Sequence, residues 1–329
     1  MEAWRSALRG DPLPWLLEAD HPAVRRLALT QLLDEPEEAP AVRRARAAAM
    51  RTDPIASILA AQDPEGWWVG PGARYGPKYT GWFWSLIFLE QMGADPRDRR
   101  VQRACDYVLD HGQARGGGFG WATANSSVAH CLTGNVLRSL LAFGRFDDER
   151  VRHGLAWEAG AITGEGHERW YPGATSGPGF ACGINGGLPC GWGAIKALRA
   201  FAAIPPRRRS RGVRRAIDRG VAFLLENDLA TGDFPTDTSI SRNWTKLGFP
   251  SGYVADSLQG LEALVELGHG RDRRLTPALD MVLGKQDADG RWRNEQPYRG
   301  RLWSDVEAPG RRSKWVTLRA CRVLRAALG

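Results

Sequence analysis

The sequence predicts an all-helical chain folded as an α/α toroid, in which five to six helix pairs form two concentric rings. Three observations predict this fold class. A glutamine–glycine–aromatic motif recurs along the chain, apolar segments alternate with arginine-rich segments, and the apolar segments begin at intervals of 50 to 64 residues. Such an interval leaves room for two helices and two loops in each unit, as in helical repeat architectures.

The recurring motif reads Q-x-x-x-G-x-(W/F) and begins at Gln62, Gln113 and Gln286. Each copy follows an amphipathic stretch whose apolar residues recur at helical spacing. We expect the glycine to end that helix in a left-handed cap and the aromatic residue to pack back on the helix end. The motif therefore predicts a structural turn and needs no chemistry to explain it.

The segments after these turns are apolar on most faces and open with small or aromatic residues. This pattern is typical of helices that are buried on both sides. A closed ring accommodates such helices better than an open rod. The predicted inner helices cover 81–93, 130–144, 190–204, 251–268 and 314–328.

The segments that precede the inner helices, such as 212–227, are arginine-rich and apolar on one side, which predicts an outer ring. Residues 1–52 contain two more helical stretches, with Pro22 and Pro40 near their starts. We interpret these stretches as a pair that completes or caps the ring. Residues 1–329 are therefore predicted to form a single toroid domain.

Composition places the chain among globular proteins, with 43% hydrophobic and 25% charged residues. There is no recognisable signal peptide and no apolar run near the roughly 18 residues of a membrane span, so we expect a cytoplasmic protein. The formal net charge is +8, and the most basic segment runs from Arg207 to Arg215. Because no nucleic-acid module accompanies its scattered arginines, we expect a solvated loop and no nucleic-acid partner. Five widely spaced cysteines favour reduced thiols.

The motif copies at Gln62 and Gln286, with a degenerate copy at Gln113, resemble the repeats of squalene-hopene and oxidosqualene cyclases. The same fold occurs in protein prenyltransferase β-subunits. Within that superfamily the chain is similar to short, stand-alone prenyltransferase and squalene oxidase repeat proteins, marked by WTKLGFP at 244–250 and SKWVTLRA at 313–320. The resemblance covers nearly the whole chain and implies the toroid fold, whereas an activity has to be argued from the site itself.

Two acidic motifs of those cyclases are missing. The D-x-D-D motif that protonates an alkene is absent, and the place where we expect it reads RWYPGATSG, from Arg169 to Gly177, without a carboxylate. The aspartate-rich D-D-x-x-D cluster that holds magnesium has its nearest match at Asp147, where the final aspartate is missing. A cyclase reaction would therefore take its acid from elsewhere in the chain.

The N-terminal ends of inner helices converge on one mouth in a toroid, and four of the five carry a lysine or histidine beside the start. Helix N-termini already carry partial positive charge and free N–H groups. The sequence therefore predicts a site for a phosphate, diphosphate or carboxylate head group, with solvated loop lysines as the alternative. The candidate substrate-binding residues are Lys78, Tyr79, His130, Trp192, Trp244, Lys246, Tyr253, Lys314 and Trp315.

Several of these candidates are aromatic, among them Trp192, Tyr253 and Trp315. An aromatic wall suits an isoprenoid chain, and its π-faces can stabilise a carbocation. Ordinary core packing is the alternative interpretation of the same residues.

The candidate catalytic carboxylates are Asp256, expected on an inner helix, and Asp237 and Asp305 in loops at the mouth. Burial would raise the pKa of Asp256 and let it act as a general acid. The alternative is that Asp256 caps a neighbouring helix or pairs with Lys246.

A further cluster consists of His130, Cys131, Cys182 and Cys190, which is a partial zinc set with one open position. The spacing of eight between Cys182 and Cys190 matches no compact ligand pair. We therefore predict neither a metal nor another cofactor.

Our first hypothesis is a terpenoid-cyclase-like enzyme, an isomerase or lyase, that acts by acid-initiated cyclisation or rearrangement. Its substrate would be an apolar, isoprenoid-type small molecule with an anionic head. The first alternative is a non-catalytic helical-repeat scaffold or lipid-binding module, and the second is a zinc-dependent toroid enzyme with Cys and His ligands. Peripheral membrane contact is compatible with the first two hypotheses, and the sequence pattern does not specify an oligomeric state.

Overall fold

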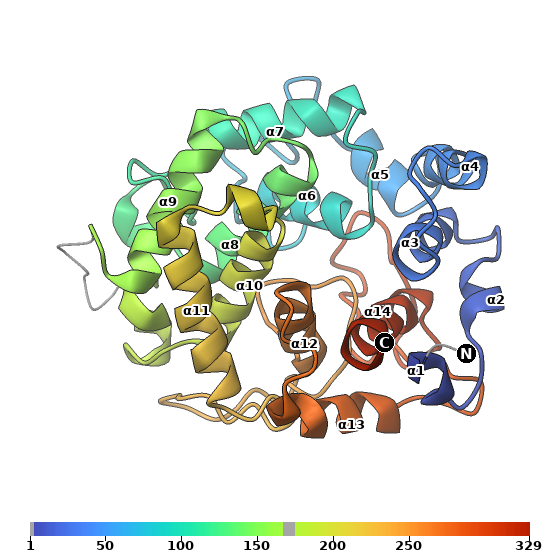
Figure 1. Cartoon of the computed structure of the whole chain (residues 1–329). Helices are drawn as coiled ribbons and strands as arrows, with labels where there is room; N and C mark the ends of the chain where they lie inside the picture. Colours follow the sequence, from blue (N-terminus) through green and yellow to red (C-terminus); the bar gives the residue numbers. More distant parts are fainter. Residues whose placement is uncertain (1–2, 167–174) are drawn as a thin grey trace.

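The computed structural model describes residues 3–166 and 175–329, and its helices form two concentric rings (Figure 1). These residues contain fourteen α-helices, of which eleven have nine residues or more, and their only extended pairing consists of isolated β-bridges. The α/α toroid predicted from the sequence is confirmed. The other three helices have only four to six residues, and the spacing of the repeats gives no signal for helices this short. In the described part of the chain, no helix is both long and apolar enough to cross a membrane.

The inner ring consists of helices that contact one another in the order α6, α8, α10, α12, α14 and α3. Arg26 closes the circle, because its guanidinium donates a 2.8 Å hydrogen bond to the carbonyl of Gly93, just after α6. Burial on both sides explains why these helices carry so many apolar side chains, as in α6, where eight of the ten residues are buried. The inner helices are α3 (Pro22–Leu32), α6 (Trp82–Gln91), α8 (His130–Ala142), α10 (Gly191–Ala202), α12 (Ser257–Glu266) and α14 (Lys314–Leu328).

The outer helices pack against this ring, and α7, α9 and α11 begin with polar side-chain caps. Asp98 accepts a hydrogen bond from the backbone N–H of Arg100 and also forms an ion pair with the Arg100 guanidinium. Asp148 makes the same two contacts with Arg150. Asp148 of the aspartate-rich match is therefore a helix cap. The outer helices are α4 (Pro40–Ala49), α5 (Ile55–Ala60), α7 (Arg99–His111), α9 (Glu149–Thr163), α11 (Arg211–Leu225) and α13 (Thr276–Gly284).

Short elements fill the remaining positions. The single turns α1 (Ala3–Ser6) and α2 (Leu13–Leu16) lie against α14. The 3₁₀ turns lie in the connections and cover Asn125–Ser127, Pro178–Phe180, Gly183–Asn185, Pro206–Arg208 and Arg273–Leu275.

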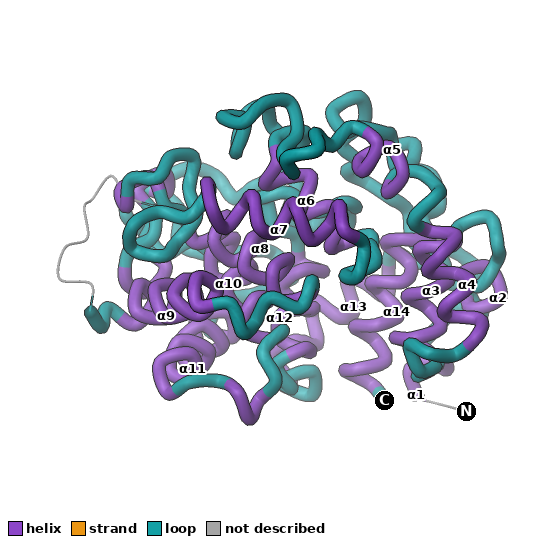
Figure 2. The backbone as a smooth tube through the Cα atoms, turned by 90° about the horizontal axis from the view of Figure 1, so that it is seen from above, coloured by secondary structure: helices purple, strands orange, loops and turns teal. Residues whose placement is uncertain are grey.

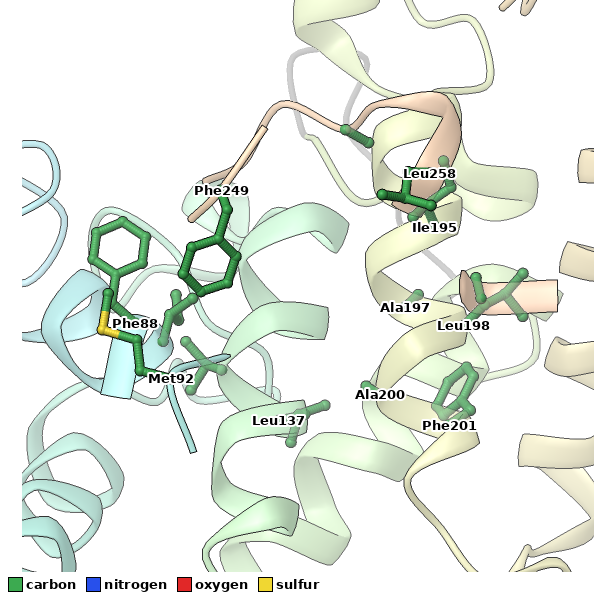
Figure 3. Close-up of a cluster of buried hydrophobic side chains, with 14 of the residues drawn as sticks. Phe88, Met92, Leu137, Ile195, Ala197, Leu198, Ala200, Phe201, Phe249 and Leu258 are labelled. Carbon is green, nitrogen blue, oxygen red and sulfur yellow. The ribbon is translucent and has the colours of Figure 1, made fainter. Parts of the chain in front are cut away.

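The core is one continuous hydrophobic cluster between the two rings and among the inner helices. Figure 3 shows part of it, with Phe88 of α6, Leu137 of α8, Leu198 and Phe201 of α10, and Phe249. Each fully buried side chain of this size contributes about 1.5–3 kcal/mol through its removal from water. This cluster is what holds the inner helices in place.

The repeated glutamine staples its turn to the next outer helix. The Gln62 amide donates to the carbonyls of Gly66 at 3.3 Å and Arg100 at 3.0 Å. The Gln113 amide reaches the carbonyl of Arg150 at 2.8 Å in the same way. The motif is therefore structural, as expected.

The glycine of the motif does not cap the helix, so that detail of the prediction was wrong. The α5 helix has already ended before the glutamine, and Gly66 lies in the following turn with a φ of 107°. The aromatic residue does return to the helix end. The indole N–H of Trp68 donates to the carbonyl of Ile58, and that of Trp292 to the carbonyl of Val282, both at 2.7 Å.

Four of the predicted inner helices begin within one residue of the expected position, and α12 begins six residues late. Its expected start at Ser251 is held in a loop, because the Gln91 amide bonds both the N–H and the carbonyl of Ser251. The helix begins only after Asp256, whose Oδ1 accepts the N–H of Gln259 at 2.8 Å. Asp256 is therefore the N-cap of α12 and not a residue within it, contrary to our expectation.

Charged side chains gather toward the C-terminal ends of the inner helices. Arg319 donates two 2.9 Å hydrogen bonds to the carboxylate of Glu262, which is only 1% exposed, and Arg138 reaches Glu266 at 2.7 Å. Burial opposes ionisation of Glu262, but the guanidiniums of Arg199 and Arg319 outweigh it and hold its pKa well below the usual range. The ion-pair network comprises Glu90, Arg138, Arg199, Glu262, Glu266, Arg319 and Arg322.

The two ends of the ring thus differ in chemistry. Figure 2 shows the ring from the side, with the loops that precede α6 along one edge and the C-terminal end of α14 at the other. The ion-pair network belongs to the second edge, and the first edge is where the N-terminal ends of α6, α8 and α10 meet.

Candidate functional site

A cavity of about 570 Å³ opens at the N-terminal ends of the inner helices. It is bounded by the first residues of α8 and α10, by the loop before α6, and by the loop between α11 and α12. Four of the sequence-predicted site residues line it, namely Lys78, Trp192, Trp244 and Tyr253. The other sequence-predicted site residues lie outside the lining of this cavity.

Aromatic rings form one wall of this cavity. Trp192 meets Tyr253 edge to face with ring centroids 6.0 Å apart, and Tyr253 also lies 6.2 Å from Trp84. Trp84 is fixed from below by Tyr75, whose carbonyl accepts its indole N–H at 2.8 Å. Offset and edge-to-face contacts of this kind are favourable, so the wall is rigid without a ligand.

Trp244 is held in place by its loop. Its indole N–H donates to the carbonyl of Leu229 at 2.8 Å, and its ring packs edge to face on Phe234. Gly232 makes this packing possible, because a Cβ there would stand 2.5 Å from the indole ring and its φ is 70°. Trp244 lines the cavity, although it is only 3% exposed.

Lys78 is the only Lys, Arg, Asp or Glu among the described residues that line the cavity. Its Nζ lies 3.3 Å from the Tyr253 hydroxyl and 4.7 Å from the centre of the Tyr253 ring. The Tyr75 ring stands on its other side at 5.7 Å. The ammonium is exposed and has no carboxylate partner in these contacts, so it is available to an anion.

Asp256, the expected general acid, does not line this cavity. It lies against a separate hollow of about 10 Å³, together with Gln259 and Tyr298. Burial raises the pKa of Asp256 above its usual value, although Arg319, 3.7 Å away, opposes that shift. The expectation that Asp256 points into the mouth beneath the lysines was wrong, because its carboxylate turns back to cap α12.

The other two carboxylates are at the surface. Asp237 is exposed and is not part of the cavity lining. Asp305 is exposed as well, accepts the N–H of Gly300 at 2.6 Å, and stands 3.7 Å from Arg299. Neither residue is placed to hand a proton to a molecule inside the ring, which corrects their assignment as catalytic partners.

The predicted convergence of three lysines is also wrong. Lys314 is buried and its ammonium contacts the carboxylates of Glu18 at 2.8 Å and Asp20 at 2.5 Å. These partners come from the N-terminal segment, which no local pattern around Lys314 reveals. Lys246 is exposed in its loop and does not line the cavity.

Tyr79 and Trp315 belong to the core. The Tyr79 ring contacts the Tyr298 ring in a tilted arrangement with centroids 4.3 Å apart, and Trp315 lies parallel to Phe249 at 4.3 Å. Both side chains are at least 95% buried. Core packing, the alternative stated for these aromatics, is therefore correct for this pair.

His130 faces the outer ring and not the mouth. Its Nδ1 lies 2.8 Å from the Glu158 carboxylate, and its Nε2 lies 2.9 Å from the carbonyl of Gly177. Burial alone would lower the pKa of His130, but the charge and hydrogen bond of Glu158 raise it above the usual value. A histidine that uses both ring nitrogens in this way is not a metal ligand.

The thiols of the proposed zinc set remain near the cavity, where Cys131, Cys182 and Cys190 line its wall. In residues 3–166 and 175–329, no group of three or more His, Cys, Asp or Glu side chains is arranged to hold a metal ion. The zinc alternative required His130 as a ligand, and His130 instead contacts Glu158 and the carbonyl of Gly177.

The rim of the cavity exposes large apolar side chains, which the sequence analysis missed. Ile184 is 79% exposed, and Trp121 and Ile240 are each 44% exposed. All three also line the cavity. Isolated hydrophobic residues in polar loops give little signal in a sequence, because only the fold brings these three loops together.

An acidic cyclase motif would be expected in the segment from Arg169 to Gly177. Positions 169–174 of this segment lie outside the residues that the structure describes. Thr175 lines the cavity.

Comparisons with known proteins concern the fold. No protein-family model matches the sequence, and no curated protein matches it. Solved structures that match include a ligand-free variant of the type II terpene cyclase MstE from Scytonema, at 16% identity over 87% of this chain and 96% of that chain, with a TM-score of 0.33. A variant of MstE in complex with geranylgeranyl dihydroxybenzoate matches at 15% identity over 87% and 97%, with a TM-score of 0.33. A protein from Actinoplanes matches at 15% identity over 86% and 99%, with a TM-score of 0.31. These values are too low to assign a substrate or an activity.

Proposed function

We propose that this chain binds an apolar, isoprenoid-type small molecule with an anionic head group in the cavity at the mouth of the toroid. One observation carries the proposal, and it concerns the lining of the cavity of about 570 Å³. The described lining is rich in aromatic rings, and Lys78 is the only lysine, arginine, aspartate or glutamate in it. Small-molecule sites typically enclose about 300–1,000 Å³ and combine an apolar wall with few polar groups. Both properties are met here.

The anionic head would lie beside Lys78. A lysine ammonium is a compact point charge with three donors, of which one points to the Tyr253 hydroxyl. A phosphate or carboxylate oxygen can accept the others. The chain of the ligand would then run along Trp192, Tyr253 and Trp244.

The exposed apolar rim supports a route of entry from a lipid surface. Trp121, Ile184 and Ile240 come from three different loops around the same opening. Neighbouring exposed apolar residues of this kind are typical of contact sites for lipids or proteins. Peripheral membrane contact, left open by the sequence, is therefore part of the proposal.

Binding has more support than conversion. An acid-initiated cyclisation needs a proton donor that faces the substrate, and the candidate carboxylates Asp256, Asp237 and Asp305 are absent from the described lining. A terpene-cyclase-like enzyme is the second candidate. It is favoured by the burial of Asp256 and by its place only three residues after Tyr253 in the sequence.

Calorimetric titration with geranylgeranyl diphosphate and with geranylgeraniol tests the binding proposal. We expect both to bind and the diphosphate to bind about tenfold more tightly, which corresponds to about 1.4 kcal/mol for a partly exposed charge contact. Failure of both compounds to bind would refute the proposal. Mass spectrometry of the same mixtures tests the second candidate, because an isomeric product that Asp256→Asn no longer forms would make the protein an enzyme.

A further inference from the structure

Two cysteines project into the cavity from one hairpin. Ala181 and Pro189 pair as an antiparallel bridge, and the N–H of Cys190 donates to the carbonyl of Phe180 at 2.9 Å. Cys182 follows Ala181, and Cys190 follows Pro189, so both side chains leave the hairpin on the face opposite to that of the bridged pair. Both residues have extended backbone angles. The hairpin therefore presents two thiols on one face as a diagonal pair.

That face is the wall of the cavity, because Cys182 and Cys190 both line it. The Cys182 and Cys190 side chains are close enough to interact. This interaction, with help from the backbone N–H groups of Ile184 and Asn185, lowers the pKa of Cys182 below its usual value. The same interaction and burial raise the pKa of Cys190.

The remaining cysteines are different. Cys131 lines the same cavity, but burial raises its pKa to about 12. Cys105 and Cys321 are buried in helices away from it. Only Cys182 combines thiolate character with access to the cavity, and only Cys190 stands next to it.

We propose that Cys182 and Cys190 are a redox-active dithiol that an apolar organic hydroperoxide entering the cavity oxidises to a disulfide. The Cys182 thiolate attacks the terminal oxygen of the hydroperoxide and breaks the O–O bond. The departing alkoxide takes up a proton and leaves as the alcohol, and Cys182 becomes a sulfenic acid. The Cys190 sulfur then attacks the Cys182 sulfur, and the hydroxyl group leaves as water with the proton of Cys190.

The balance of this sequence is one hydroperoxide and two thiols converted to one alcohol, one water and one disulfide. The hydroperoxide is reduced by two electrons, and the two sulfurs are oxidised by two. The apolar lining selects the oxidant, since hydrogen peroxide gains nothing from contact with Trp192 and Tyr253. The proposed step does not use Lys78, but it takes place in the same cavity as the proposed anionic ligand.

The test treats the reduced protein with cumene hydroperoxide and, in parallel, with hydrogen peroxide. Intact mass and peptide mapping then follow the product. We expect loss of two hydrogen atoms, a peptide that links Cys182 to Cys190, and faster reaction with the apolar oxidant. Cys190→Ser should stop at a sulfenic acid on Cys182 that dimedone captures, and Cys182→Ser should react with neither oxidant at this hairpin.

Cys131→Ser is the matched control and should behave as the wild type, since it removes a thiol from the same wall. Circular dichroism of each variant checks that the ring is intact. A disulfide that involves Cys131, dimedone capture on Cys190 in place of Cys182, or equal rates with the two oxidants would overturn the proposal.

Discussion

Two cavities of nearly equal volume lie at opposite ends of the part of the toroid that the structure describes, and their linings differ. The mouth cavity measures about 570 Å³ and is lined by aromatic and small side chains with one lysine. The second cavity measures about 560 Å³ and is lined in part by Glu262, Glu266, Arg322 and Arg325. Volume therefore cannot tell which of the two receives a ligand.

The pairing of the charges does distinguish them. In the second cavity Glu262 binds Arg319, Glu266 binds Arg322, and Arg325 binds Asp34. At the mouth, the Lys78 ammonium lies against the rings of Tyr253 and Tyr75, and its charge is open to solvent. The ring thus has compensated charges on its inner helices at one end, where they order the ring, and an uncompensated charge in the loop before α6 at the other, where it can serve a ligand.

Arg319→Met should have the largest effect and should act on stability. It leaves Glu262 buried with Arg199 as its remaining partner, and removing one member of a buried pair costs about 3–5 kcal/mol. Urea unfolding measures the change. The double variant Arg319→Met with Glu262→Met should recover part of the loss, because no uncompensated carboxylate remains. An unchanged midpoint in the single variant would contradict the structural role of this end.

Lys196→Met should change stability in the opposite direction. Lys196 lies in α10 with 1% exposure and bonds the Gln259 side chain, and burial followed by the charge of Arg199 lowers its pKa to about 7. The unfolded value is 10.5, so between these two pH values the unfolded state binds more protons and stability rises with pH. At pH 7 the lysine costs about 4 kcal/mol, which the methionine should restore.

Urea midpoints from pH 7 to pH 10 measure this difference. The gap between Lys196→Met and the wild type should shrink as the pH rises, and Lys246→Met, at an exposed site, should follow the wild type throughout. A gap that stays constant across this range would mean that Lys196 is protonated in the folded state.

Trp192→Ala should weaken binding at the mouth without a comparable loss of stability. Its ring is half-buried, contacts Tyr253 and lines the cavity, so its removal takes away apolar contact with the ligand. We expect about 2 kcal/mol of lost affinity for geranylgeraniol, a typical contribution of one buried aromatic side chain. Calorimetry gives the affinity and urea unfolding gives the stability. A loss of stability with unchanged affinity for geranylgeraniol would mean that Trp192 packs in the core and does not contact the ligand.

Lys78→Met should have the smallest effect, confined to the head group. It should reduce the affinity for geranylgeranyl diphosphate about tenfold and leave that for geranylgeraniol unchanged. Lys246→Met is the control, because Lys246 carries the same charge on a neighbouring loop but does not line the cavity. If the two variants reduced the affinity equally, the diphosphate would be attracted by the net positive charge of the protein and not by a specific site at Lys78.

The ring was predictable from the sequence because its signals are local. Repeat spacing and apolar segments fix the inner helices, and the Q-x-x-x-G-x-(W/F) turns fix the joints between units. Asp256 was misassigned although a local signal was present, since an aspartate followed three residues later by Gln259 is the pattern of a helix cap. A capping aspartate needs no catalytic explanation.

The contents of the mouth were less predictable because they depend on long-range partners. The charge of Lys314 is cancelled by Glu18 and Asp20, almost 300 residues away in the chain. His130 turns toward Glu158 on an outer helix, which no spacing rule indicates. The three thiols were considered as zinc ligands, and only the hairpin geometry shows that two of them lie on one face of the same hairpin.

A crystal structure of the protein with geranylgeranyl diphosphate tests the central claim most directly, because it decides between the two ends of the ring. We expect the prenyl chain against Trp192 and Tyr253 and the diphosphate within hydrogen-bond distance of the Lys78 Nζ, with the cavity beside Glu262 and Arg322 free of ligand. A ligand bound beside Glu262 and Arg322, or a mouth that stays empty at saturating concentration, would contradict the assignment of binding to the mouth.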